Sequence, residues 1–586
     1  MPNLCARSPI IKFLPGLAIG ALSIGLAAQQ SEPQVPGPTI RVNTRLVLVD
    51  VVVTDKQGHT VSGLKADDFA VEENGKKQKI STFVGPEVAA RKSEVPTLAP
   101  GLYTNRPDFR SNGGPLTILL LDALNTPFRD QSYARSQMLA YVRTQLKPDQ
   151  RLAVFALTND LRMLEDFTGD PQILLTALQK LKPEEPILTN AAAPPDSSLG
   201  PGPGPGAAAA SLVAMAANQI AGFQAEQVGF ALDRRVQVTL AAMRALARAL
   251  GGMPGRKEVI WLTAAFPFEL IPENRDVSDA ELEASLPNIQ QKSVGTLAAG
   301  SIAEQQRGAY APEIREAAAE LSASQVAIYP LDVRGLMSGM EGAAARLPVH
   351  SQGAVGFDPT AGMQDVAASQ DTMREIAMET GGRAYVNQND IKSGVADVLA
   401  DSSATYTLGY YPENKKWDNK YRVIKVKLSR PDFQLHHRRG YYAFDPTQVK
   451  DRKADQEVSE ALRVSIPATL VIFSARAKTN DKGKLHVDFL VDPTSLSSGE
   501  ASGGAKKLNV SLYAAVFSAE GKMIANRSLK VDQEFKADTY QQVRQHGMLV
   551  PMDLDIAPAA NTQLRLAVRD ERTGFIGTTL GTLTTQ

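Results

Sequence analysis

The chain has very little cysteine and histidine and no net charge over its 586 residues. Its single cysteine, Cys5, lies inside the predicted N-terminal signal peptide, so the sequence beyond it excludes disulfides, thiol catalysis and cysteine metal sites. The 6 histidines show neither the HExxH motif nor another metal-binding spacing. Because 63 basic residues balance 63 acidic ones, no long-range field favours nucleic acid or anionic lipid. We therefore expect a protein partner recognised by local shape and chemistry, and no nucleic acid.

Two common enzyme motifs are also missing. No G-x-S-x-G motif is present, which excludes that form of nucleophile elbow. The Gly/Pro repeat at 200–206 lacks the Lys-Ser or Lys-Thr pair that a phosphate-binding loop requires. The sequence therefore favours a protein that is not an enzyme.

The N-terminus has the features of a secretory signal peptide. Arg7 and Lys12 precede an apolar run, Phe13 to Ala28, that ends in small residues. A run of about 15 apolar residues is short for a bilayer span, which needs about 20, and an uncleaved anchor is the alternative. We expect residues 1–28 to be removed, which leaves an exported protein, periplasmic or secreted, without a membrane span.

The remaining chain changes its pattern several times. Period-two alternation predicts strands near its start and again beyond residue 403, whereas strands and helices alternate between these parts. Such alternation is typical of a mainly parallel sheet covered on both faces. The two β segments together predict about seven strands, the number in an immunoglobulin-like sandwich, so we expect one composite sandwich with the α/β domain inserted between its halves. A further run of strands predicts a C-terminal β-sandwich.

These patterns divide the chain into domains and linkers. The composite sandwich has its N-terminal half at 40–84 and its C-terminal half at 403–445, separated by a linker at 85–114 and the α/β domain at 115–402. Loop insertions interrupt that domain near 190–225, 266–307 and 337–369, a second linker covers 446–461, and the C-terminal sandwich covers 462–586. Because working loops of α/β proteins follow strand ends, we expect these insertions to contribute to a binding surface.

Several long segments of the sequence resemble one known family. They are VVVTDKQGHTVSGLKADDFAVEENGKKQKISTF, DRRVQVTLAAMRALARALGGMPGRKEVIWLTAAFP, AIYPLDVRGL, ETGGRAYVNQNDI and TYTLGYYPENKKWDNKYRVIKVKL. In this order they resemble the von Willebrand factor type A-related (Acidobacterial-type) domain family over about residues 40–445. The resemblance implies a von Willebrand type A-like, Rossmann-like doubly wound fold. It also implies contact with a protein partner, often through a metal ion.

The resemblance further implies a metal site at the carboxyl edge of the sheet. The family pattern there is Asp-x-Ser-x-Ser, a loop Thr and a second Asp. In this chain Asp122 and Thr126 match it and Thr189 is a candidate for the loop Thr, but Leu124 and Ala264 replace two ligands. Mg²⁺ prefers an octahedron of oxygens with one or two carboxylates. We expect a degenerate site without a cofactor, in which Asp122 caps a helix or accepts hydrogen bonds from loop amides; Mg²⁺ or another divalent cation is the alternative.

Asp122 also allows one catalytic hypothesis. Asp122 and Asp332 both end predicted strands, and they would lie about 10 Å apart across an intervening strand, a separation that suits an inverting hydrolase. No other feature of the sequence supplies a substrate pocket.

The function we expect is that of an exported, non-catalytic protein-binding or adhesion-type protein that uses the edge around Asp122. One alternative is a structural or assembly factor of the cell envelope that binds through its sandwich edges. The other alternative is the hydrolase.

Overall fold

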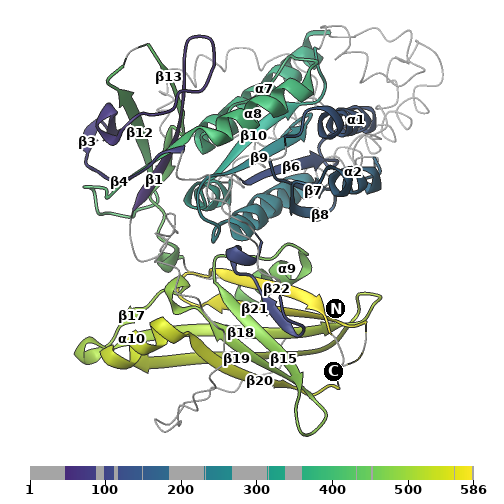
Figure 1. Ribbon diagram of the computed structural model, residues 1–586, viewed down its shortest axis with the longest axis vertical. Coiled ribbons are helices and arrows are strands. Elements are labelled where there is room, and N and C mark those ends of the chain that lie inside the picture. Colours follow the sequence, from purple (N-terminus) through teal and green to yellow (C-terminus); the bar gives the residue numbers. More distant parts are fainter. Residues whose placement is uncertain are drawn as a thin grey trace, which may run out of the picture.

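The computed structural model describes most of the chain beyond residue 45. It describes residues 46–86, 98–110, 116–147, 150–183, 230, 233–266, 313–314, 316–336, 359–430, 432–449, 453–557, 559 and 561–583. The predicted signal peptide, the first insertion and most of the other two insertions lie outside these residues. The described part is a mixed α/β protein with several sheets, one of which contains parallel strands (Figure 1).

One sheet consists mainly of parallel strands and lies at the upper right of Figure 1. Its strand order is β8–β7–β6–β9–β10, and β8 alone runs antiparallel to its neighbour. All residues of β6, β7, β9 and β10 are buried because helices cover both faces, which explains their continuous apolar runs. The bounds are β6 Leu116–Asp122, β7 Leu152–Leu157, β8 Leu161–Thr168, β9 Lys257–Thr263 and β10 Val326–Asp332.

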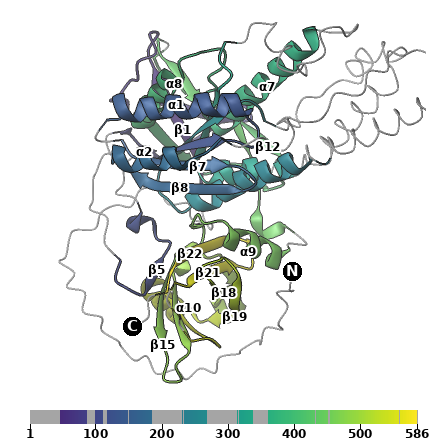
Figure 2. The same ribbon diagram turned by 90° about the vertical axis from the view of Figure 1, so that its right-hand side faces the viewer.

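Successive residues of β6 point to opposite faces of the sheet and enter two separate apolar cores. Ile118 and Leu120 pack with the helices at 233–250 and 316–323 and with α7. Leu119 and Leu121 pack with α1, α2 and α8, and Figure 2 shows α1 and α2 side by side. The bounds are α1 Phe128–Thr144, α2 Pro171–Lys180, α7 Pro359–Thr380 and α8 Ile391–Ser403. The end of the third predicted insertion, 337–369, is therefore the first part of helix α7 and not a loop.

Strands from two distant parts of the chain pair in two four-stranded sheets, with orders β13–β1–β11–β4 and β14–β12–β2–β3. Both sheets take strands from before and after the α/β domain, and Val49, Val51, Tyr406 and Leu408 lie in one shared core. The strands are β1 Val47–Thr54, β2 Phe69–Glu73, β3 Lys76–Gln78, β4 Ile80–Val84, β11 Thr405–Tyr410, β12 Tyr421–Leu428, β13 Gln434–His437 and β14 Gly440–Tyr442. Neither part of the chain forms either sheet by itself.

The C-terminal sandwich contains a strand that sequence analysis assigned to a linker. β5 (Leu102–Thr104) lies within the segment 85–114, yet it pairs antiparallel with β15. The next residue, Asn105, is fully buried, and its side-chain amide forms three hydrogen bonds of 2.7–2.9 Å with backbone groups of the chain around the start of β15. The linker assignment was wrong here because three residues are too few to show a β periodicity.

The two sheets of the C-terminal sandwich have the orders β20–β16–β15–β5 and β17–β18–β21–β22, and β19 pairs with β18. The second predicted linker, 446–461, is also partly ordered into an element, since helix α9 packs against β21 and β22 through Val458 and Ala461. The bounds are α9 Ala454–Arg463, β15 Phe473–Thr479, β16 Leu485–Val491, β17 Gly499–Glu500, β18 Lys506–Phe517, β19 Met523–Phe535, α10 Ala537–His546, β20 Met548–Leu554, β21 Gln563–Asp570 and β22 Ile576–Thr582.

Side chains and backbone groups join the parallel-sheet domain to both sandwiches. Gln325 donates to the carboxylate of Asp50 in β1 at 3.3 Å. On the other side, Thr469 N–H donates to Arg248 O at 2.7 Å, and Gly252 N–H donates to Thr469 Oγ1 at 2.9 Å. Within the described ranges, no helix has both the length and the apolar character that crossing a bilayer requires.

Candidate functional site

Asp122 ends β6 at the carboxyl edge of the parallel sheet and is 2% exposed. Its carboxylate accepts four hydrogen bonds of 2.9–3.0 Å, from the backbone N–H and Nδ2 of Asn125, from Trp261 Nε1 and from Thr263 Oγ1. Burial raises the pKa of Asp122, and these hydrogen bonds oppose that rise. Because Trp261 and Thr263 lie on β9, the carboxylate fastens the loop after β6 to the neighbouring strand.

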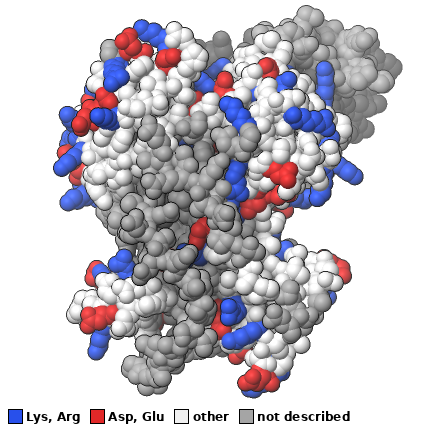
Figure 3. All heavy atoms as spheres, in the orientation of Figure 1, with Lys and Arg blue, Asp and Glu red and all other residues white. Residues whose placement is uncertain are grey.

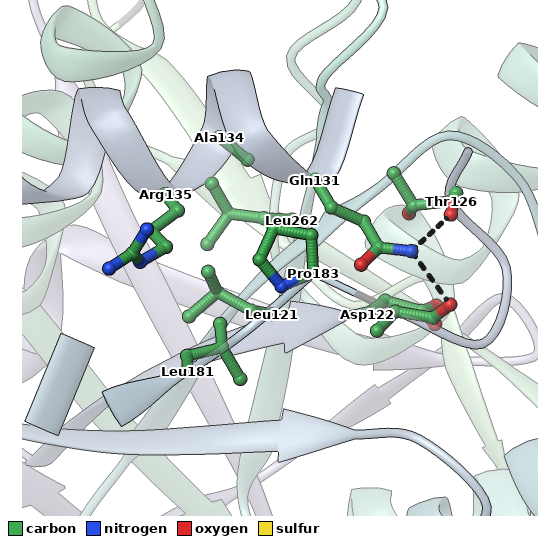
Figure 4. Close-up of a pocket in the computed structure, with 10 residues that line it drawn as sticks. Leu121, Asp122, Thr126, Gln131, Ala134, Arg135, Leu181, Pro183 and Leu262 are labelled. Carbon is green, nitrogen blue, oxygen red and sulfur yellow. Dashed lines mark hydrogen bonds between the residues drawn. The ribbon is translucent and has the colours of Figure 1, made fainter. Parts of the chain in front are cut away.

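The rest of the loop that matches the family pattern is also held by contacts within the protein. Thr126 Oγ1 accepts from the backbone N–H of Ala264 at 3.1 Å. The backbone oxygens of Ala123 and Thr126 both accept from Gln131 Nε2, at 3.1 and 2.7 Å, and Figure 4 shows the Gln131 side chain pointing towards Thr126. Leu124 is buried in the apolar core. The loop therefore closes on itself and on the start of α1.

An arginine from another helix reaches the same loop. Arg235 Nε donates to Asn125 Oδ1 at 3.0 Å, and Asn125 Nδ2 donates to Thr239 Oγ1 at 3.2 Å. Arg235 and Thr239 are four residues apart and thus lie on one face of the helix at 233–250. Partial burial lowers the pKa of Arg235, and the charge of Asp122 acts in the opposite direction. A guanidinium thus stands next to the carboxylate that a metal ion would otherwise neutralise.

These donors do not fit a hard divalent cation. Both oxygens of Asp122 already face N–H or O–H groups, and the indole of Trp261 and the amide nitrogen of Asn125 can donate but not ligate. Mg²⁺ needs oxygen lone pairs on all sides. Among the described residues, no group of three or more His, Cys, Asp or Glu side chains is placed to hold a metal ion. Thr189, the candidate loop ligand, lies outside the described residues.

A small pocket lies beside this loop, between α1 and the ends of β6 and β9 (Figure 4). Its lining is mostly apolar, and Asp122, Thr126, Gln131 and Arg135 are its polar members. Its volume is about 10 Å³, which is roughly the space that one water molecule needs. The pocket is therefore too small for an organic substrate.

The second strand-end carboxylate, Asp332, is held separately. Asp332 is fully buried, and Arg334 donates to its two oxygens from Nε and Nη2 at 2.8 Å each. Gln370 Nε2 donates to it as well, at 3.1 Å. Strand β9 lies between β6 and β10, so Asp122 and Asp332 do not meet. Each carboxylate has its own donors, which does not fit a cooperating acid–base pair.

Sequence reasoning missed four residues of this site: Trp261, Thr263, Arg235 and Thr239. One of them could have been found, because a buried Trp in an apolar strand needs an acceptor for its N–H and a strand-end carboxylate is a good one. The others depend on how the helix at 233–250 and β9 lie against the loop after β6. No local pattern carries that information.

Comparisons with known proteins found solved structures that are remotely similar. No family model and no curated protein matches the chain. An aerotolerance-related membrane protein of Bacteroides fragilis is 13% identical with a TM-score of 0.22, over 49% of this chain and 98% of that one. Proximal thread matrix protein 1 of the mussel byssus is 10% identical with a TM-score of 0.22, over 49% and 47%. The PilB minor pilin of Streptococcus sanguinis is 10% identical with a TM-score of 0.23, over 49% and 60%.

Proposed function

We propose that the chain is an exported, non-catalytic protein-binding protein of the adhesion type. Its contact surface is the carboxyl edge of the parallel sheet, in a von Willebrand type A-like domain whose metal-ion-dependent adhesion site is degenerate. One observation supports this most directly. The two strand-end carboxylates are bound by the protein's own side chains, while two large apolar side chains near them, Phe128 and Leu336, are exposed by 47% and 60%.

The strand order supports the position of this surface. From β6 the chain goes to β7 on one side, and it later adds β9 on the other side. Ligands of open α/β sheets bind outside the carboxyl ends of the strands at such a reversal. Asp122 lies at that point, and the loop after it contains Thr126. The edge is therefore the position where a binding surface is expected, whatever its chemistry.

The exposed apolar side chains stand on well-fixed backbone. Leu336 N–H donates to Asn389 Oδ1 at 2.8 Å, and Asn389 O accepts from Tyr133 of α1 at 2.6 Å. Phe128 begins the same helix. Apolar side chains held in place at a surface cost little entropy to bury against a partner, as protein–protein contacts require.

The chemistry of the edge favours binding over catalysis. A general base needs a carboxylate that can accept a substrate proton. The carboxylates of Asp122 and Asp332 instead accept hydrogen bonds from neighbouring side chains of the protein, and the adjoining pocket has room for about one water.

The second candidate, an assembly factor of the cell envelope, is favoured by a different surface. Leu490 and Leu549 are cross-strand partners on β16 and β20, and they are 43% and 65% exposed. They form a small apolar area on the outer side of the C-terminal sandwich. A partner that binds there would leave the parallel sheet free.

Site-specific photo-crosslinking in the producing cells separates the two candidates. A photoreactive residue is placed at Leu336 or Phe128, and in matched variants at Leu549 or Leu490. We expect one discrete crosslinked protein from Leu336 and Phe128 and none from the sandwich positions. Crosslinks from Leu549 and Leu490 alone would instead support the assembly factor, and uniform weak products from all four would reject both surfaces.

A further inference from the structure

Two arginines at the carboxyl edge are each anchored on a strand-end acid. Arg235 is fixed through Nε to Asn125, which in turn is held by Asp122. Arg334 is fixed through Nε and Nη2 to Asp332. The two acids end β6 and β10, which flank β9, so the two anchors are about 10 Å apart at the usual strand spacing.

Both guanidinium groups keep donors that no described residue uses. Arg235 has no described acceptor for Nη1 or Nη2, and Arg334 has none for Nη1. Arg235 is partly exposed, and the side chain of Arg334 is 12% exposed. A guanidinium held at one end keeps its fork in a fixed orientation, which lowers the entropy cost of a second hydrogen-bonded partner.

Among the described residues, two further charged groups lie near Arg334 at this edge. Arg129 lies nearby on α1, and Asp130, whose burial raises its pKa, is a second acid close to Arg334 and Asp332. Elsewhere charges of both signs are interspersed, as Figure 3 shows for the described residues of one face. Attraction to an anionic group therefore comes from these fixed donors and not from the overall charge of the protein.

We infer that the carboxyl edge binds a carboxylate side chain of its partner, an Asp or a Glu, through the guanidinium of Arg235 and without a divalent cation. This inference rests on the proposed function, and it assigns the chemistry of the contact. The Nη1 and Nη2 groups of Arg235 donate to the two carboxylate oxygens, the arrangement that suits a planar fork.

The test uses the full mature chain in EDTA with acetyl-aspartate methylamide as the probe. Side-chain N–H signals of ¹⁵N-labelled arginine are followed by NMR, and acetyl-asparagine methylamide is the uncharged control probe. We expect the Arg235 signals to shift saturably with the aspartate probe only. Arg235→Lys keeps the charge but lacks the fork, and we expect it to weaken binding about tenfold, which is the effect of losing roughly 1.4 kcal/mol. The neighbouring exposed Arg234→Gln is the matched control and keeps full binding.

Three results would overturn the inference. They are no saturable shift at Arg235, an equal shift with the asparagine probe, and binding that appears only after Mg²⁺ is added. Thermal unfolding of Arg235→Lys checks that a loss of binding is not a loss of fold. Partner crosslinks at Leu336 without carboxylate binding would keep the proposed function and reject this inference. Carboxylate binding without crosslinks would keep the carboxylate site at Arg235 but reject the proposed function, and with it the contact to a partner.

Discussion

The side chains of Asp122 and His486 show how their surroundings decide what a charged group does in this protein. Asp122 is buried among four donors and holds two strands' ends together. His486 lies near the surface of β16, where Nδ1 contacts Asp553 at 2.7 Å and Nε2 contacts Asp488 at 2.9 Å. The first group has a structural role that does not need solvent, whereas the acidic neighbours of the second raise its pKa.

Replacing Asp122 by Asn should destabilise the parallel-sheet domain by about 1–3 kcal/mol. The amide of the Asn variant can accept only at its oxygen. Its NH₂ group would therefore face donors that lose their acceptor when the carboxylate is replaced. Urea unfolding followed by the fluorescence of buried Trp261 measures the change. Asp160→Asn, in an exposed turn, is the control and should stay within about 0.5 kcal/mol. Equal unfolding midpoints for the two variants would contradict the role of Asp122.

The C-terminal sandwich should lose stability as pH rises above neutrality. Burial by itself would lower the pKa of His486, but hydrogen bonds to Asp553 and Asp488 and their charges raise it overall. A raised folded-state pKa contributes stability below the unfolded value, about 6.5, and loses it as pH rises through the folded value. The effect should be less than about 1 kcal/mol at this near-surface position. Unfolding measured from about pH 5.5 to about pH 9, a range that includes the unfolded-state pKa and values above it, detects this loss of stability.

His486→Asn should flatten this pH dependence. His546→Asn is the matched control, because His546 is exposed at the end of α10. If both variants keep the slope of the parent protein, the histidine–carboxylate contacts do not contribute.

Among the described elements, strand β5 departs most from the domain boundaries that the sequence predicts. It comes from the segment between β4 and β6, yet it completes a sheet of the C-terminal sandwich. The hydroxyl groups of Thr104 and Ser474 form a hydrogen bond of 2.9 Å across the same pair of strands, and Tyr103 is buried in the sandwich core. The chain leading into the parallel-sheet domain is thereby fastened to the last domain.

Asn105→Ala should destabilise the C-terminal sandwich by roughly 2–4 kcal/mol, because three backbone groups lose their partner in a site without solvent. Chemical unfolding of the full chain, with hydrogen exchange of β15 as the local probe, measures the loss. The matched control is Asn526→Ala, which removes the same side chain at an exposed position of β19. Unchanged exchange in β15 would show that β5 is not needed to hold that edge.

At the scale of the whole molecule, three units are joined by close backbone contacts. The helix at 233–250 ends in Gly251 and Gly252, and a Cβ on Gly252 would lie 2.0 Å from Thr469 O. Thr469 is fully buried and accepts from Gly252 N–H while donating to Ala249 O at 2.9 Å. This contact places the end of a helix of one domain directly on the chain that enters the C-terminal sandwich.

Gly252→Ala should separate the C-terminal sandwich from the parallel-sheet domain. The new methyl group meets backbone, which cannot move away as a side chain would, and such overpacking costs about 1–3 kcal/mol. In calorimetry, the variant should show two separate unfolding transitions, and the parent protein should show fewer because its domains unfold together. Small-angle scattering should show a larger radius of gyration for the variant. Thr469→Ser keeps the hydroxyl and should change neither measurement. Coupled unfolding in Gly252→Ala would mean that the contact does not hold the domains together.

Local sequence patterns located several elements correctly. β6 and β10 span the two apolar runs that end in Asp122 and Asp332, residue for residue. Between β2 and β3, Asn74 and Gly75 have positive φ angles of 47° and 77°, which a tight hairpin requires and an Asn-Gly pair favours. Short or contact-dependent elements were missed, namely β5 and the start of α7, because their residues carry no periodicity of sufficient length.

The sequence by itself determined the mixed α/β character, the strand ends at the candidate site and the loss of two metal-ligand positions. These follow from side-chain period and residue type, which are local properties. Only the tertiary structure decided what the remaining polar side chains do. Asp122 meets Trp261 and Asn125 meets Arg235 across 139 and 110 positions of sequence. Such partners become neighbours when sheets and helices pack, and their hydrogen bonds determine that the edge presents arginine donors and not open carboxylates.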